Sequence, residues 1–136
     1  MLAPRKQKYR KQFRGGFRRI ATKGNKVDFG SFGIKALEAG WIRDREIEAC
    51  RVILARATRK VGKFWIRIFP DKSYTKKPPE VGMGAGKGDV AYFVAVVEPG
   101  KVLFEIDGLP EKEAISTLKK VSSKLSVKSK IVKREE

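Results

Sequence analysis

The sequence predicts an α+β fold: a single compact domain with two helices packed on a mostly antiparallel sheet, a basic N-terminal arm and a long Gly-rich loop. Three observations support this prediction. The chain has 136 residues and is 41% hydrophobic, which suits one domain with a modest core. Segments rich in β-branched and aromatic residues alternate with two segments of helical periodicity. Their order is strands, helix, strand, long loop, hairpin, helix, strand, which is typical of α+β domains.

The first half of the chain is expected to contain a short strand and a long helix. Residues 27–32 (VDFGSF) alternate as a strand does, and Gly30 and Gly33 mark bends or a bulge. A helix follows that begins near Arg45 with Asp44 as its cap and ends at Gly62. Its apolar stripe comprises Ile47, Cys50, Leu54, Ala57 and Val61. Its opposite face is basic and comprises Arg45, Arg56, Arg59 and Lys63.

The second half is expected to contain three strands and a second helix. Residues 63–69 (KFWIRIF) form a strand that Pro70 stops, and residues 71–89 form a long loop. Residues 90–97 and 101–106 pair as a hairpin across Glu98, Pro99 and Gly100. After Gly108 and Pro110 comes a helix, and a last strand lies near residues 127–133. The apolar stripe of this helix comprises Ala114, Leu118, Val121 and Leu125.

Charge is the strongest functional signal. The net charge is +17, which points to a polyanionic partner, with nucleic acid ahead of an anionic membrane surface. Residues 1–26 carry ten Lys and Arg and no acidic residue. This run is either a solvated basic tail or an arm that orders on RNA, with Tyr9 and Phe13 on the partner and Phe17 in the core. We therefore divide the chain into an arm at 1–16, a domain at 17–133 and a tail at 134–136.

Most enzyme classes are disfavoured. The chain has no histidine, and its one cysteine, Cys50, lies on an apolar helix stripe and is interpreted as a small buried hydrophobic residue. One cysteine allows neither an internal disulfide nor a cysteine-based zinc site. The glycine run VGMGAGKGDV at 81–90 resembles a phosphate loop. However, Val81 stands where the first P-loop glycine belongs, and Gly88 where the hydroxyl residue belongs.

The glycine run retains a weaker property. Gly82, Gly84, Gly86 and Gly88 leave the backbone bare at alternate positions, so amide groups can approach a polyanion closely. The alternative is a flexible hairpin tip that has no partner.

Together these segments resemble a family, the bacterial large-subunit ribosomal protein numbered sixteen, which is related to the archaeal and eukaryotic protein numbered ten. The matching stretches occur in order from Met1 to about Val132. They are MLAPRKQKYRKQFRG, FGSFGIKALEAGWI, REIEACR, GKFWIRIFPDKSYTKKP, MGAGKG, VAVVEPGKVLFEIDG and KLSVKSKIV. The combination of IRIFPDK with a following MGxGKG loop is specific to this resemblance.

The resemblance implies a structural ribosomal protein that binds large-subunit rRNA, joins late in subunit assembly and contacts tRNA near the aminoacyl site. Its neighbours would be other ribosomal proteins, and its location ribosome-bound and cytoplasmic, with an organellar ribosome left open. No cofactor, metal, membrane or small-molecule substrate is implied. The arm residues that match are Arg5, Lys6, Lys8, Tyr9, Arg10, Lys11 and Arg14. The loop residues that match are Met83, Gly84, Gly86, Lys87 and Gly88.

Basic residues elsewhere extend the expected RNA contacts. To the rRNA set we add Arg18, Arg19, Arg56, Arg59 and Lys72, and to the tRNA- or rRNA-facing loop Lys76 and Lys77. The basic helix face is either solvated or part of the RNA contact. The chain departs from the usual family loop at Gly82, where an arginine is usual, and at Ala85, where a lysine is common. Two alternative functions stay open: a free-standing RNA chaperone or regulator, and a nucleotide-dependent enzyme.

Overall fold

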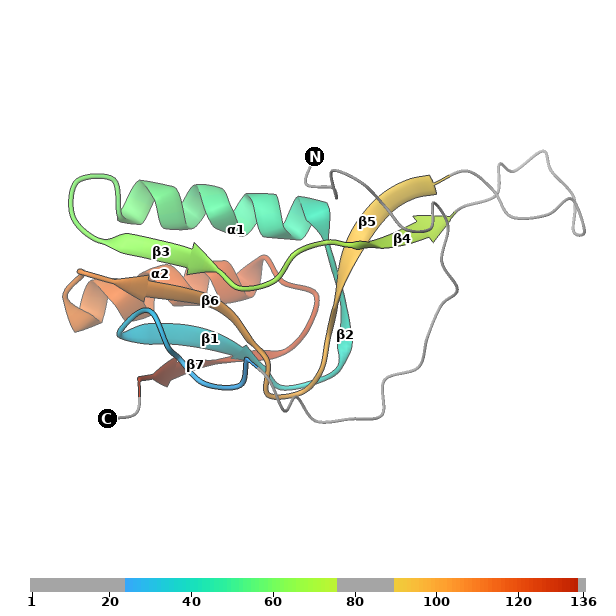
Figure 1. Cartoon of the computed structure of the whole chain (residues 1–136). Coiled ribbons are helices and arrows are strands. Elements are labelled where there is room, and N and C mark those ends of the chain that lie inside the picture. Colours follow the sequence, from blue (N-terminus) through green and yellow to red (C-terminus); the bar gives the residue numbers. More distant parts are fainter. Residues whose placement is uncertain (1–23, 76–89, 135–136) are drawn as a thin grey trace, which may run out of the picture.

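The computed structural model describes residues 24–75 and 90–134, and their arrangement is shown in Figure 1. The elements follow one another in this order: β1 (Phe32–Ala36), β2 (Gly40–Arg43), α1 (Asp44–Ala57), β3 (Lys63–Ile66), β4 (Lys72–Thr75), β5 (Val90–Val97), β6 (Val102–Asp107), α2 (Glu111–Ser123) and β7 (Ser129–Lys133). The strands form two antiparallel sheets, one of order β3-β6-β1-β7 and one of order β2-β5-β4. This arrangement confirms the predicted α+β class.

Both helices pack on one face of the four-stranded sheet (Figure 1). In this sheet Ile34 of β1 pairs with Phe104 of β6, and paired residues project to the same face. Both side chains are fully buried against Leu54 of α1 and Leu118 of α2. Burial of apolar area of this kind is the main favourable term in folding. The core therefore lies between the helices and this face, and the opposite, open face is left for other contacts.

Helix α1 differs from its prediction at both ends. It begins at Asp44, and the side chain that caps its start belongs to Glu46, whose Oε2 accepts a hydrogen bond from Arg43 N at 2.7 Å. It ends at Ala57, and the C-cap residue Thr58 donates to Leu54 O from both its backbone N, at 3.0 Å, and its Oγ1, at 2.8 Å. Val61 is consequently off the helix and 63% exposed. The first three residues of the predicted apolar stripe, Ile47, Cys50 and Leu54, are buried as expected.

The four-membered basic face predicted for this helix was wrong. Arg45 and Arg56 are exposed on α1, but Arg59 lies beyond its end and Lys63 begins β3. Gly62 has a φ of +102°, which lets the chain reverse between the helix and the strand.

The predicted strand at 27–32 was also wrong, since only Phe32 belongs to β1. Residues 24–30, called the strap below, precede β1 and cross the open face of the four-stranded sheet. Val27 is 8% exposed and packs over β1, because a Cβ placed on Gly33 would lie 2.9 Å from its side chain. Gly30 lies so close to β6 that an added Cβ would be 2.6 Å from Ile106 O. Close packing on the sheet, rather than strand pairing, fixes this segment.

The predicted hairpin between residues 90–97 and 101–106 does not form. β5 pairs with β2 and β4, whereas β6 pairs with β1 and β3, so Glu98, Pro99 and Gly100 connect two sheets. The sequence prediction also missed β2, and it missed β4, which lies inside the expected loop at 71–89. β3 ends at Ile66, earlier than expected, although Ile68 is still buried.

The C-terminal elements agree with the prediction. Ala114, Leu118 and Val121 of α2 are buried as the stripe required, and Leu125 packs against the core just beyond the helix. β7 covers most of the last predicted strand and forms an edge of the four-stranded sheet.

Candidate nucleic-acid interface

Most of the predicted interface lies outside the described residues. This holds for every predicted rRNA contact before residue 24, namely Arg5, Lys6, Lys8, Tyr9, Arg10, Lys11, Arg14, Arg18 and Arg19, and for Phe13 and Phe17. It also holds for the loop residues Lys76, Lys77, Met83, Gly84, Gly86, Lys87 and Gly88. Their roles remain predictions. The described ranges contain the other three residues of the predicted set, Arg56, Arg59 and Lys72.

These three residues are not brought together into one site. Arg56 is exposed in the last turn of α1, and Arg59 is exposed just past the end of the helix, so both flank that helix end. Lys72 begins β4 in the other sheet and is half-buried. The basic residues near the end of α1 therefore form a surface separate from that of Lys72.

Cations of the three-stranded sheet lie over aromatic rings. Arg43 and Lys72 both pair with Val94, so the three side chains share one face of this sheet. Lys72 Nζ lies 4.5 Å from the centroid of the Trp41 ring, and the Arg43 guanidinium carbon lies 3.8 Å from the centroid of Tyr92. Such contacts fix where the two cations lie, and Arg43 Nε also lies 3.7 Å from the Asp44 carboxylate.

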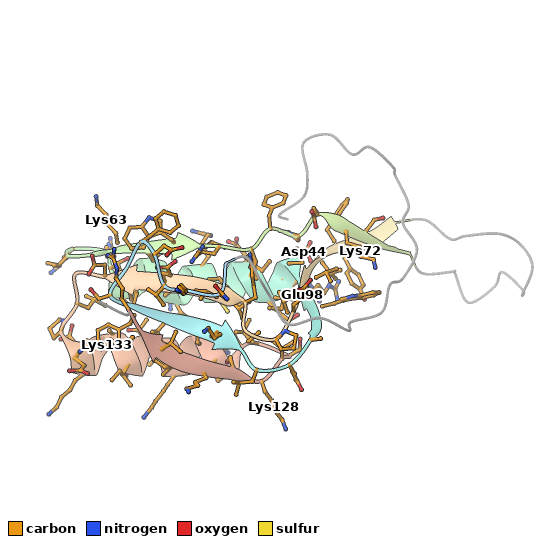
Figure 2. The ribbon with its side chains drawn as sticks, turned by 60° about the horizontal axis from the view of Figure 1, so that its bottom comes forward. Asp44, Lys63, Lys72, Glu98, Lys128 and Lys133 are labelled. Atoms are coloured by element: carbon orange, nitrogen blue, oxygen red, sulfur yellow. The ribbon has the colours of Figure 1, made fainter. Side chains whose placement is uncertain are left out.

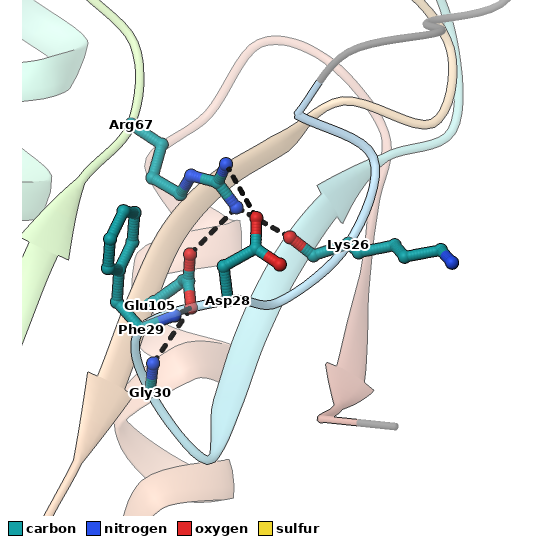
Figure 3. Close-up of polar contacts among 6 residues, drawn as sticks. All are labelled: Lys26, Asp28, Phe29, Gly30, Arg67 and Glu105. Carbon is teal, nitrogen blue, oxygen red and sulfur yellow. Dashed lines mark hydrogen bonds and ion pairs between the residues drawn. The ribbon is translucent and has the colours of Figure 1, made fainter. Parts of the chain in front are cut away.

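A buried ion pair ties the strap to the open face of the four-stranded sheet (Figure 3). Glu105 of β6 is fully buried, and its Oε1 accepts hydrogen bonds from Phe29 N at 2.8 Å and from Gly30 N at 2.9 Å. Its Oε2 accepts one from Arg67 Nη1 at 2.9 Å. Arg67 also donates to Lys26 O at 2.5 Å, and it lies 3.3 Å from the Asp28 carboxylate.

This arrangement satisfies a charge that would otherwise be costly to bury. A buried carboxylate needs a counter-ion and hydrogen-bond donors, and Glu105 has one cation and two backbone amides. The Arg67 side chain is 14% exposed and lies 5.2 Å from the centroid of the Phe29 ring. The pair therefore fixes both ends of residues 26–30 and sets the position of the Phe29 ring.

A groove with a volume of about 680 Å³ runs between the strap and the C-terminal edge of the same sheet. Its lining includes one acidic residue and five basic ones: Asp28, Lys26, Lys35, Lys130, Lys133 and Arg134. Figure 2, which turns the bottom of Figure 1 forward, shows Lys128 and Lys133 projecting near the two ends of β7. This basic groove is lined by more basic residues than two other depressions among the described residues, which are lined by two lysines and by one.

This groove was not predicted from the sequence. The position of Lys35 opposite Lys130 follows from β1 pairing with β7, which joins segments almost a hundred residues apart. A signal was available for Glu105, since an acidic residue inside an apolar strand is almost never fully buried without a partner.

Cys50 and Asp107 each have a perturbed pKa with a clear cause. Burial raises the pKa of the Cys50 thiol to about 12, so it stays a neutral core residue, as predicted. The Ser31 hydroxyl donates to Asp107 Oδ1 and, with the Gly108 amide, lowers the pKa of that carboxyl. Within 24–75 and 90–134, no three His, Cys, Asp or Glu residues are grouped so that they could hold a metal ion. Neither helix in these ranges is long and apolar enough to cross a membrane.

Comparisons with known proteins agree with the sequence resemblance. Residues 4–132 match the family described as ribosomal protein L16p/L10e. A large ribosomal subunit protein uL16 of Thermosipho africanus is 53% identical over 136 residues, which is 100% of this chain and 96% of that protein. The uL16 of Fervidobacterium nodosum is 54% identical over 98% of this chain and 94% of its own length. A uL16c of Emiliania huxleyi is 53% identical over 99% of this chain and 98% of that protein. The chain therefore belongs to the ribosomal protein L16p/L10e family and is a structural protein of the large ribosomal subunit, not an enzyme.

Proposed function

We propose that this protein holds large-subunit rRNA through its N-terminal arm and reaches towards tRNA near the aminoacyl site with the glycine-rich segment at 76–89, between β4 and β5. As a large-subunit protein it associates with rRNA and with neighbouring ribosomal proteins. The finer assignment is supported by the charge of residues 1–26, which carry ten basic residues before the first acidic one, Asp28; six of the ten lie in the arm at 1–16. Basic side chains bind phosphates with release of counter-ions, and Tyr9 and Phe13 offer rings on which bases stack.

The loop is proposed to contact tRNA by shape more than by side-chain charge. Its glycines allow close approach of backbone amides, and Lys87 contributes one positive charge. Gly82 and Ala85 carry no charge, so Lys87 is the one cation within residues 81–90. We extend the proposal to a role late in subunit assembly and to the division into an arm at 1–16, a domain at 17–133 and a tail at 134–136.

One observation carries the proposal, namely a family match over residues 4–132 in a chain with a net charge of +17. Co-sedimentation of the full chain in a lysate of its host tests it. The protein should sediment with large subunits and with late assembly intermediates at moderate salt. A chain that stays at the top of the gradient would contradict this proposal and favour a free-standing RNA chaperone.

The arm can be tested separately from the domain. The double variant Arg10→Ala/Arg14→Ala should bind large-subunit rRNA more weakly and with a smaller dependence of log K on log salt, since two phosphate contacts are lost. Its far-UV circular dichroism should match that of the wild-type chain. The control is Lys119→Ala/Lys120→Ala, which removes the same charge from exposed positions of α2. Equal rRNA affinity in the two double variants would refute the role of the arm.

A further inference from the structure

The open face of the four-stranded sheet carries two like charges in direct opposition. Lys35 of β1 pairs with Lys130 of β7, so both side chains lie on one face. That face is the open one, because the neighbouring position of β1, Ile34, points into the core. Like charges directly opposite each other destabilise a sheet. An anion that binds between the two lysines would relieve this repulsion.

The groove beside this pair extends the positive charge along one line. Lys26 comes from the strap and Arg134 follows β7, and both are exposed. The acidic residue of the lining, Asp28, already accepts the guanidinium of Arg67 at 3.3 Å. Its negative charge is therefore partly neutralised, and the groove as a whole attracts anions.

An exposed aromatic ring lies at the end of the same strap. The Phe29 side chain is 54% exposed, and its ring stacks on Trp65 with 6.0 Å between centroids and 25° between planes. Trp65 pairs with Glu105, which places it on the open face. The ion pair between Arg67 and Glu105 holds this part of the strap in place, as Figure 3 shows. A large apolar ring is thus kept exposed and rigid within a highly charged surface.

We propose that this open face is a second RNA-binding surface, distinct from the arm and the loop, in which the groove cations hold a sugar–phosphate backbone and the Phe29 ring stacks on an unpaired base. The inference rests on the proposed function, because it takes the partner to be large-subunit rRNA. A row of cations beside one fixed ring is how proteins bind single-stranded nucleic acid. An acidic protein would also form ion pairs with the lysines, but it would offer no base to stack on the Phe29 ring.

The lysines are tested by the salt dependence of binding. In the full chain, Lys35→Gln/Lys130→Gln should reduce the slope of log K against log salt for purified large-subunit rRNA by about 1.4–1.8, the value for two lost phosphate contacts. Lys119→Gln/Lys120→Gln on α2 is the matched control and should leave the slope nearly unchanged. Without RNA, the groove variant should melt at the same temperature as the wild type or higher, because the repulsion between the two lysines is removed.

The ring is tested by a change in affinity without a change in slope. Phe29→Leu keeps an apolar side chain on Trp65 but removes the stacking surface, and it should weaken rRNA binding about tenfold at every salt concentration. A slope that falls as in the lysine variant, or an affinity equal to that of the wild type, would overturn the role of the ring.

The outcomes separate this inference from the function on which it rests. If wild-type protein does not bind large-subunit rRNA at all, the proposed function fails. If it binds, and the groove variant and its α2 control have the same slope, only the second surface is refuted. If the groove variant binds purified rRNA normally but no longer joins large-subunit particles, an acidic ribosomal protein occupies the open face, and the inference is wrong.

Discussion

Replacing Glu105 with alanine should destabilise the domain far more than the loss of Asp28, the exposed acidic residue of the same contacts. The change leaves the amides of Phe29 and Gly30 without their acceptor and removes the buried partner of Arg67. Each buried donor left unpaired costs about 1–3 kcal/mol. Arg67 keeps the Lys26 carbonyl and Asp28 as partners, which limits the further loss. We expect a decrease of about 3–5 kcal/mol in the free energy of unfolding.

Urea denaturation followed by far-UV circular dichroism measures this loss. With a slope of about 1.5 kcal/mol per molar urea, the midpoint should fall by roughly 2–3 M. Asp28→Ala is the comparison, because Asp28 also contacts Arg67 but its side chain is 57% exposed. That variant should lose less than about 1 kcal/mol, as exposed ion pairs do. Amide hydrogen exchange at Phe29 and Gly30 should accelerate in Glu105→Ala alone.

The result that refutes this reasoning is a Glu105→Ala variant no less stable than Asp28→Ala. It would mean that water replaces the lost carboxylate and that the strap does not depend on the buried ion pair. Glu105→Gln should lie between the two, because its oxygen still accepts from the strap amides while its NH₂ group faces the donor Arg67 Nη1.

Three further predictions address separate parts of the fold. Gly62→Ala should cost more than about 1 kcal/mol, since φ is +102° and the new Cβ would lie 2.5 Å from Asp107 O; an unchanged melting temperature would contradict this. At pH 8, Cys50 in the folded chain should react with a thiol reagent roughly a thousandfold more slowly than in urea, because burial raises its pKa to about 12; equal rates would show that the thiol is accessible. The pKa of Asp107 is lowered in the folded state, so its stabilising effect is complete above its unfolded pKa of about 4 and is lost as the pH falls through its folded pKa. Asp107→Asn should therefore reduce the loss of stability between pH 6 and pH 3, and an equal loss in both chains would refute that.

Helical periodicity was the part of the fold that the sequence predicted best. Ile47, Cys50 and Leu54 in α1, and Leu118 and Val121 in α2, were identified as buried because their spacing is a local property. Residues three and four apart share a helix face whatever the rest of the chain does. The predicted end of α1 at Gly62 was wrong, because the helix ends at Ala57 and Gly62, with a φ of +102°, lies in the turn that follows.

Strand pairing could not be predicted in the same way, because it depends on distant segments. The turn at Glu98, Pro99 and Gly100 favours a hairpin locally, yet Gly100 N donates to Ala36 O and the chain enters the other sheet. β5 instead joins β2, which buries Ile42 with the core side of β5. The burial of this apolar area outweighs the local tendency of the short turn to form a hairpin.

The candidate interface likewise has one part that depends on local sequence and one part that depends on contacts between distant segments. The charged arm was predicted from composition, which needs no fold. The groove exists only because β1 pairs with β7 in a particular register. The strap is held by the buried Glu105, and no local sequence pattern indicates that this residue lies beneath residues 29 and 30. Sites made by local runs of charge are visible in a sequence, whereas sites made by sheet register are not.

The pairing of β1 has a consequence for protein synthesis. A ribosome makes Phe32–Ala36 before either of its partners, β6 and β7, and the strap must likewise wait for Glu105. The nascent chain thus keeps an apolar strand without a partner until about three quarters of the protein has been translated. Contacts so distant in sequence slow folding and leave strand edges exposed to aggregation. During translation, the exposure of β1 therefore ends only when β6 and β7 pair with it, unless a chaperone covers the strand first.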